Sequence, residues 1–576
     1  MTARRRAVPT RRTRVGLLLS SPEVRAWAWT AIRDIAASRH AEIVAVAISA
    51  GRRGRRRPFR GLLRRIDELL DRRIPADQDA FVRKDARPLL PGVPVQRLRR
   101  SEGGARTPGN EDVSGLQARD LDVLLWFGEG GRPRGDLLRV ARAGLWSFHL
   151  GDRRERRGGP SGFWEVHDRW PVTGAALQIL TDDPARSLTL GRTSTATVPT
   201  SIKRTRNALV WAALPLLERA LEALGREGVD AFLDRVVREN AAPSFYSNRR
   251  FRSPGLADLL VHAARRATRL AWIVARRPVS RQQWVLYYGL ADDLIEDCSR
   301  LRPLAPPVDR FWADPHAVIV GDRYFVFVEE LPYATGKGHI AVIEIDAEGR
   351  PGPARKVLEE AHHLSYPLVF QHDGDYFMVP ESAARGTIDL YRATAFPDRW
   401  AFVEHLMTGI EAYDATLLHE HDRWWLFASV IKYPGAGSGE LVLYSSDRLA
   451  GGDWRLHPAS PLWSDVTGAR PAGAILRRNG RLFRPAQDGS GLYGRAIKLN
   501  EILELTEDTY REQLVSRIEP GWNRRIMRTH TIAHAGRLTV VDALWRRSRW
   551  ALPTLGREEE TAATDDQARR SLRASS

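Results

Sequence analysis

Five polar residues in the C-terminal half of the chain occupy similar places in a repeated pattern, and their side chains could do chemistry together. They are Asp314, Tyr366, Asp414, Arg470 and His530, and each lies shortly before a polar turn and a short apolar run. Carboxyl groups transfer protons, while guanidinium and imidazole groups bind anions and orient carboxylates. Glu381 adds a carboxyl group at the end of the second apolar run. Brought together, these side chains would form a site for a polar ligand.

The repeated pattern predicts the elements that position these residues. A polar turn followed by aromatic or β-branched residues is typical of the second strand of a β-hairpin. The pattern occurs five times at intervals of roughly 50 to 60 residues, which is the length of a four-stranded propeller blade. The aligned residues are Tyr324, Tyr376, Trp424, Leu482 and Leu538. We therefore predict an all-β five-bladed β-propeller over residues 282–548, with a strand at Trp284–Gly289 in its closing blade.

First strands line the axis of a propeller, so the five polar residues are predicted to converge on one axial funnel. A buried polar group is costly unless it has a partner, such as a ligand or another polar group. Carboxylates at the start of two separate blades, Asp314 and Asp414, are the strongest candidates for a functional role. His530 is expected to form hydrogen bonds, and no metal ion is predicted.

Alternating strands and helices are predicted for residues 14–225. Strand–helix–strand units form parallel sheets, so this region is predicted to be an α/β domain with a parallel sheet. Residues 51–118 are expected to be an insertion with one amphipathic helix at Leu62–Leu70. The predicted strands are Arg14–Ser20, Glu42–Ile48, Asp120–Gly128 and Gly144–His149, with a helix at Pro22–Ser38.

Three motifs of this domain resemble the formyltransferase family, which includes methionyl-tRNA and glycinamide ribonucleotide formyltransferases. They are Ser147-Phe148-His149 at a strand end, Thr173-Gly174 in a later strand, and Thr181-Asp182 after it. The resemblance implies proton transfer by His149 and Asp182, and a donor of the 10-formyltetrahydrofolate type. In the family an Asn amide stabilises the oxyanion, whereas this chain has Ser147. Three alternatives follow: a water replaces the amide, the reaction differs, or the site is degenerate.

The propeller resembles the arabinanase, levansucrase and invertase superfamily, which includes family 43 glycoside hydrolases. The opening Ala313-Asp314-Pro315 and the five blades carry this resemblance. It implies that Asp314 is a general base or nucleophile and that Asp414 orients the acid. Blade four has Arg470 where the superfamily has a catalytic Glu. Glycoside hydrolysis needs two carboxyl groups, so another residue such as Glu381 or Glu329 would have to supply the acid.

A denser set of ordered motifs resembles the N-terminal propeller domain of plant glucosamine inositolphosphorylceramide transferase. The set runs over residues 285–545 and includes Trp312–Pro315, His363–Pro367, Pro380–Ser382, Arg470–Gly473 and Arg484–Asp488. In the plant enzyme a separate glycosyltransferase domain accompanies the propeller. The resemblance therefore implies that the propeller is the part that binds a glycan or glycolipid.

Composition limits the partners and the compartment. The formal net charge is +19, but no nucleic-acid-reading element accompanies it, so no nucleic acid partner is expected. A single cysteine fits a reducing compartment, and we expect a cytoplasmic protein. A helical linker is predicted over 226–281, and the arginine-bearing stretch Leu256–Ile273 would either pack on a domain or lie on an anionic membrane. The tail 549–576 is predicted to be disordered.

Three functional hypotheses follow. The first is a carbohydrate-active transferase that modifies an amino-sugar or glycolipid, in which sugar, sugar nucleotide or glycolipid binds the propeller. The second is a non-catalytic glycan-binding protein with a vestigial formyltransferase fold, and the third is a glycoside hydrolase with a rearranged general acid. The predicted catalytic residues are His149, Asp182, Ser147, Asp314 and Asp414; the predicted substrate-binding residues are Glu381, Arg470, Tyr366, His530 and Gln487.

Overall fold

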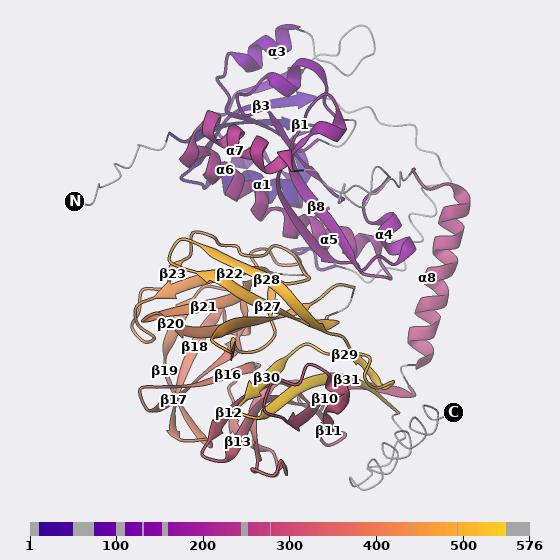
Figure 1. Ribbon diagram of the computed structural model, residues 1–576. Helices are drawn as coiled ribbons and strands as arrows, with labels where there is room; N and C mark the ends of the chain where they lie inside the picture. The colour runs from indigo at the N-terminus through magenta and orange to yellow at the C-terminus, as the bar shows by residue number, and fades with distance from the viewer. Residues whose placement is uncertain are drawn as a thin grey trace, which may run out of the picture.

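Two domains and a long helix at their side make up the protein, as a computed structural model shows (Figure 1). The α/β domain and the five-bladed β-propeller predicted from the sequence are both confirmed. The structure describes residues 11–49, 74–98, 110–128, 132–151, 159–242, 252–276, 278–437, 439–491 and 493–548. The helix predicted at Leu62–Leu70 and the tail 549–576 lie outside these ranges. Within them, no helix is both long enough and apolar enough to cross a membrane.

A seven-stranded sheet forms the centre of the N-terminal domain, in the order β5-β3-β1-β6-β7-β8-β9. The first five strands in this order are parallel, and β8 runs antiparallel to both neighbours. The order reverses between β1 and β6, which is where open sheets of this kind bind ligands, beyond the carboxyl ends of the strands. The strands are β1 (Thr13–Leu19), β3 (Ala41–Ser49), β5 (Val95–Leu98), β6 (Val123–Trp126), β7 (Leu145–His149), β8 (Val172–Ile179) and β9 (Leu188–Ala196).

Helices pack on the sheet through buried apolar side chains. Val15 and Leu17 of β1 are fully buried and join one core with Leu209 of α5 and Leu221 of α6. The Ser201 side chain accepts a hydrogen bond from the Arg204 amide and so caps α5 at its start. The helices are α1 (Ala26–Ala36), α3 (Asn110–Gln117), α4 (Phe163–Asp168), α5 (Ile202–Ala213), α6 (Pro215–Glu227), α7 (Val229–Ala241) and α8 (Leu256–Arg276); β2 (Glu23–Arg25) pairs with β4 (Arg83–Asp85) beside them.

Five antiparallel sheets form the blades of the propeller. In blades four and five the inner strand is split into two pieces, β24 with β25 and β29 with β30. Blade one has β12 (Arg310–Val320), β13 (Arg323–Pro332), β14 (His339–Ile345) and β15 (Arg355–Leu358). Blade two has β16 (Ser365–His372), β17 (Asp375–Ser382), β18 (Thr387–Ala395) and β19 (Arg399–Thr408). Blade three has β20 (Ala412–Glu420), β21 (Arg423–Val430), β22 (Glu440–Ser446) and β23 (Arg455–Leu456). Blade four has β24 (Arg470–Pro471), β25 (Leu476–Arg478), β26 (Arg481–Asp488), β27 (Ala496–Leu505) and β28 (Tyr510–Ile518).

The fifth blade joins the two ends of the propeller. Its strands are β29 (Ile526–Arg528), β30 (Ile532–Ala535), β31 (Leu538–Ser548), β10 (Ser280–Leu290) and β11 (Arg302–Leu304). Strand β10 pairs with β31 along its whole length, from Ser280 opposite Ser548 to Leu290 opposite Leu538. The pairing confirms the strand predicted at Trp284–Gly289. It closes the ring with hydrogen bonds between segments far apart in the sequence.

The two domains are packed together rather than tethered. Tyr433, in the loop after β21, stacks on Trp211 of α5 at 6.0 Å and donates a hydrogen bond to Asp34 of α1 at 2.8 Å. Ser194 of β9 forms a parallel bridge with Asp465, just before blade four. Glycine is required at Gly435, where φ is +92° and a Cβ atom would lie 3.2 Å from Trp211. Blade three therefore inserts a loop into the side of the N-terminal domain.

Candidate functional site

Three successive blades break their inner strand at the same place, and the break positions three of the predicted site residues. Asp314, Tyr366 and Asp414 have positive φ angles of 51°, 41° and 53°. In each case the strand register shifts at that residue. A left-handed residue at a bulge re-aims its side chain, and it is strained for residues other than glycine. The equivalence of these positions, inferred from the repeat, is thus visible in the backbone.

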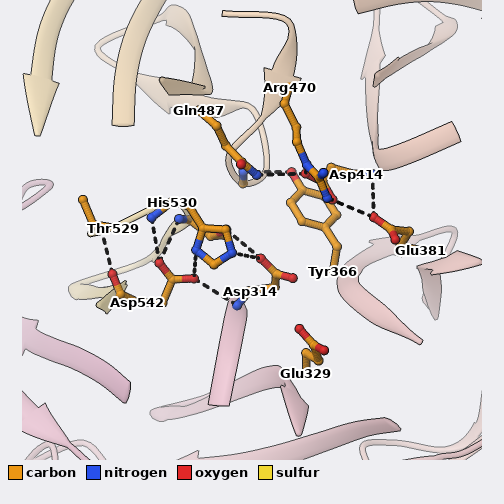
Figure 2. A network of polar contacts seen from close by, with 12 residues as sticks. Asp314, Glu329, Tyr366, Glu381, Asp414, Arg470, Gln487, Thr529, His530 and Asp542 are labelled. Carbon is orange, nitrogen blue, oxygen red and sulfur yellow. Dashed lines mark hydrogen bonds and ion pairs between the residues drawn. The ribbon is translucent and has the colours of Figure 1, made fainter. Parts of the chain in front are cut away.

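Arg470 organises one half of the site (Figure 2). Its Nε and Nη2 atoms donate to the two oxygens of Asp414 at 2.5 and 3.1 Å, and Nη2 lies 3.4 Å from Glu381. Gln487 donates to the same Asp414 carboxylate at 2.9 Å. Asp414 is only 1% exposed. A buried carboxylate needs a counter-charge, and the Arg470 guanidinium supplies it. Four predicted site residues from three blades are therefore brought together.

His530 organises the other half. Its Nδ1 lies 2.6 Å from Asp542, and its Nε2 lies 3.3 Å from Asp314. Thr531 donates to Asp314 at 2.8 Å, and the Asp314 amide donates to Asp542 at 3.1 Å. All four side chains are almost completely buried. Blade one and the closing blade are thus joined through an aspartate–histidine–aspartate row (Figure 2).

Tyr366 lies next to the Arg470 half and joins three blades. Its hydroxyl lies 2.9 Å from the Thr416 hydroxyl and accepts a hydrogen bond from the Gly473 amide at 2.8 Å. Burial raises the pKa of Tyr366 well above its ordinary value. The phenol is therefore neutral and structural at ordinary pH. Together we call Asp314, Tyr366, Glu381, Asp414, Arg470, Gln487, His530, Thr531 and Asp542 the axial cluster.

The environment separates the protonation behaviour of the carboxyl groups. Burial raises the pKa of Asp314 to about 7, although His530 opposes it. Burial and the neighbouring Asp414 raise the pKa of Glu381 well above its ordinary value. Burial lowers the pKa of His530, but Asp542 and Asp314 outweigh it and raise that pKa to about 9. Carboxyl groups kept protonated beside charged partners are suited to general acid chemistry.

Two tyrosine rings flank Arg470, which is the most exposed side chain of the axial cluster. The Arg470 guanidinium lies 5.0 Å from the ring centre of Tyr413 and 5.1 Å from that of Tyr493. The Arg470 side chain is 29% exposed and Tyr493 is 45% exposed, while the carboxylates beneath are buried. Gly491, close to Tyr493, donates a backbone hydrogen bond to Pro171 of the N-terminal domain at 2.6 Å. The N-terminal domain therefore contacts the propeller close to Tyr493.

One set of side chains among the described residues has the spacing of a metal site. Ligand atoms of Asp314, His530 and Asp542 lie within 4.8 Å of one another, and all three residues are buried. Their mutual contacts already give each charged group a partner. The prediction that no metal binds stays a prediction.

The N-terminal candidates are not gathered in one place. Ser147 is buried and donates to the Phe148 carbonyl at 3.4 Å, and His149 pairs with Ala176 at the carboxyl end of β7. Asp182 follows the end of β8 that lies beside the start of β7, and its carboxylate pairs with Arg139 at 2.6 Å. The antiparallel register thus places Asp182 away from His149. The Arg153–Gly159 loop that the family motif includes lies almost wholly outside the described residues.

Sequence reasoning missed several members of the site. Asp542 and Thr531 belong to the axial cluster, and the Tyr493 ring lies beside the Arg470 guanidinium. Glu329, which the sequence offers as an alternative acid, is buried near Asp314. Glu329, Glu381, Ser429 and Gln487 face Ala313, Ser365, Tyr413 and Arg470 across equivalent strand pairs, so they form a second ring. Asp542 lies in an apolar strand of the weakest repeat and gave no such signal.

Comparison with known proteins finds its clearest match in the propeller. Residues 290–526 match the family model described as glucosamine inositolphosphorylceramide transferase 1, N-terminal. Among curated proteins, glucosamine inositolphosphorylceramide transferase 1 of Oryza sativa subsp. indica is 38% identical over 207 residues, which is 35% of this chain and 27% of that protein. The Arabidopsis thaliana protein of the same name is 35% identical over 209 residues, again 27% of its length. The match thus spans about a quarter of these relatives.

Solved structures resemble each domain separately. The catalytic domain of an α-L-arabinofuranosidase from Coprinopsis cinerea aligns with 43% of this chain and 96% of its own, at 13% identity and a TM-score of 0.33. Glycinamide ribonucleotide transformylase 1 from Symbiobacterium toebii aligns with 37% of this chain and 88% of its own, at 14% identity and a TM-score of 0.27. At such scores the strand order, rather than these likenesses, defines the two folds.

Proposed function

We propose that the protein is a carbohydrate-active transferase that modifies a glycolipid or amino-sugar, and that the axial cluster binds the sugar. The observation that carries the proposal is the Arg470–Asp414–Glu381–Gln487 group beneath two tyrosine rings. Sugar hydroxyls hydrogen-bond well to guanidinium, carboxylate and amide groups, and sugar rings pack on aromatic side chains. The names of the relatives, which are transferases of a glycolipid, support the same class.

In this proposal the protonated carboxyl groups supply a proton to a departing oxygen. Glu381 is the best placed donor, because it is held neutral next to Asp414, whose charge Arg470 compensates. Asp314 has a pKa of about 7 and is the second candidate. The His530–Asp542 pair orients Asp314 and compensates its charge when it ionises.

The N-terminal domain would supply the transferred group in the finer version of the proposal. Ser147 and His149 are alternate residues of β7, so their side chains project from the same face of the strand. His149 lies at the carboxyl edge of the sheet, near the point where its strand order reverses. In this version a donor of the 10-formyltetrahydrofolate type binds there. Titration calorimetry would test it: saturable binding that His149→Ala weakens supports this version, and no binding removes it.

Transfer itself is tested with an inositolphosphorylceramide acceptor and nucleotide-activated amino-sugars, with the products read by mass spectrometry. We expect product from the wild type, and a loss of about a hundredfold or more in Asp414→Asn, because the substitution removes the carboxylate that orders Arg470 and Gln487. Asp447→Asn is the matched control, since the Asp447 side chain is 81% exposed on blade three. If no donor gives product, but a glycan array shows binding that Asp414→Asn abolishes, the protein is a non-catalytic glycan-binding protein. The proposal would be overturned if the protein gave no product with any donor and also bound no glycan.

Glycoside hydrolysis is the second candidate, and the raised pKa of Glu381 favours it. A hydrolase needs one protonated and one ionised carboxyl group. Glu381 and Asp414 lie beside the same guanidinium and could fill these roles. Chromogenic arabinosides, xylosides and fructosides test this alternative. Release of the chromophore by wild type but not by Glu381→Gln would establish it, and silence on all three substrates counts against it.

A further inference from the structure

Helix α8 presents its apolar face to solvent and its polar face to the protein. It stands at the side of the molecule, between the N-terminal domain and β10 (Figure 1). Of its 21 residues only His262 and Arg266 are fully buried. His262 packs on the rings of Phe163 and His167 of α4, at 5.2 and 5.9 Å. The inner face of α8 therefore carries its polar side chains together with Leu259, Leu270 and Ile273, whereas an ordinary surface helix turns its apolar face inward.

The outer face is apolar along the whole helix. At 100° per residue, one half of the helix surface carries twelve exposed residues, and Thr268 is the only polar one. The twelve are Leu256, Ala257, Leu260, Val261, Ala263, Ala264, Ala267, Thr268, Ala271, Trp272, Val274 and Ala275. Leu260 is 52% exposed, Trp272 50% and Val274 62%. A helix of this length is roughly 30 Å long, so the apolar strip is far larger than scattered surface residues.

Arginines border one edge of this strip, and the helix's one acidic residue lies on the same edge, near the start of the helix. Arg276 and Arg546 both lie against the Trp272 ring, at 3.7 and 5.6 Å. Arg265 follows the same edge and contacts His167 at 3.3 Å. Asp258 is held by hydrogen bonds near the start of the helix. An apolar strip edged by arginines and an interfacial tryptophan has the chemistry of a helix that lies in a membrane surface.

We propose that α8 docks the protein on an anionic membrane, with the strip from Leu256 to Ala275 in the acyl boundary and its arginines on lipid phosphates. The proposal goes beyond the sugar site and does not depend on it. A second copy of the chain fits the strip less well, because it would bring a second arginine edge rather than complementary negative charge. Anionic lipids complement those arginines. The same surface would bring a glycolipid substrate to the protein.

A single labelled cysteine tests the proposal on the full chain. The native Cys298 is 3% exposed and burial raises its pKa to about 12, so it reacts little with a thiol probe. Leu260→Cys carries an environment-sensitive fluorophore on α8, and Val515→Cys, 55% exposed on β28, is the matched control. Vesicles are made of phosphatidylcholine alone or mixed with phosphatidylglycerol. We expect the emission to shift to the blue only for the α8 label, and only with the mixed vesicles.

Flotation of unlabelled protein gives the second readout. The double variant Leu260→Glu with Val274→Glu should bind mixed vesicles about tenfold or more weakly, while Val515→Glu should bind as the wild type does. Replacing Arg276 and Arg546 by Gln should weaken binding to mixed vesicles and leave pure phosphatidylcholine unchanged. The proposal is overturned if neither label shifts. It is also overturned if the α8 label is already blue-shifted without lipid, or if light scattering finds a dimer that the double variant dissociates.

Discussion

Among single residues, Arg470 has the largest predicted effect on stability. It is the cation for Asp414, which is 1% exposed, and it also lies 3.4 Å from Glu381. Arg470→Gln should lower the free energy of unfolding by about 3 kcal/mol, because a buried carboxylate loses its counter-charge. Urea unfolding of the full chain measures this change.

Two further variants make that prediction specific. Arg477→Gln breaks an exposed ion pair with Glu420 on the outside of the propeller, where the Arg477 side chain is 56% exposed, and should cost under about 1 kcal/mol. Adding Asp414→Asn to Arg470→Gln should recover part of the loss. Equal stability of the single and double variants would contradict the assignment of a buried charge pair.

His530 predicts a pH dependence with a defined sign. Asp542 and Asp314 raise its pKa in the folded state to about 9, above the ordinary value of 6.5. The folded state then binds the proton more tightly than the unfolded state does. His530 therefore gives its full stabilisation to the folded state below its ordinary pKa, and this stabilisation is lost as the pH rises through 9. Between these pH values the wild type should lose up to about 3 kcal/mol relative to His530→Asn. Thermal melts of both proteins at pH 6 and pH 10 measure this change. If the prediction is wrong, the melting temperatures of wild type and variant will differ by the same amount at both pH values.

The residue types of the site were readable from the sequence, but their pairing was not. Asp314 and Asp414 stood out because the repeat aligned them. Nothing local indicated that Asp542 would meet His530 at 2.6 Å, since that contact forms when the last inner strand and β31 meet. In the N-terminal domain, the Thr181-Asp182 motif suggested a partner for His149. The antiparallel register of β7 and β8 instead carries Asp182 to the far end of the strand.

At the scale of elements, Tyr366 shows how a blade depends on its neighbours. Its hydroxyl contacts Thr416 of blade three and the Gly473 amide of blade four. Tyr366→Phe leaves the ring in place but orphans a buried amide, and should destabilise the propeller by about 1–3 kcal/mol. Tyr376→Phe is the control, because that ring stacks on Phe396 away from the axis. Chemical denaturation of the two variants should separate them, and similar midpoints would mean that the Tyr366 hydroxyl is dispensable.

The same elements explain what a repeat can and cannot predict. Blade number and the closing strand followed from spacing, because each blade is a local hairpin pattern that the sequence repeats. The left-handed bulges at Asp314, Tyr366 and Asp414 could not be predicted from the spacing, because residues other than glycine adopt that conformation only under tertiary constraint. Helix α8 was read correctly as a helix. Its apolar face points to solvent because His262 on the opposite face packs against α4. Sequence periodicity does not predict such a contact.

At the scale of the whole molecule, the contact between the domains determines how the sites are arranged. Pro171, just before β8, accepts a hydrogen bond from Gly491 of blade four, close to Tyr493 beside the axial cluster. His149 pairs with Ala176 on the same strand, a few residues further along. The carboxyl edge of the N-terminal sheet therefore lies on the side of the propeller that carries Gly491.

This arrangement predicts that the two domains unfold as a unit and that Tyr433 couples them. The Tyr433 ring is 7% exposed, stacked on Trp211 and hydrogen-bonded to Asp34, although it belongs to blade three. Tyr433→Ala removes a buried aromatic side chain and should cost about 3–5 kcal/mol at the interface. Calorimetry should then resolve two transitions where the wild type shows one. Tyr444→Ala, in β22 of the same blade but away from the interface, should lower the midpoint and keep a single transition. Two transitions in the wild type would mean that the domains are stable independently of each other.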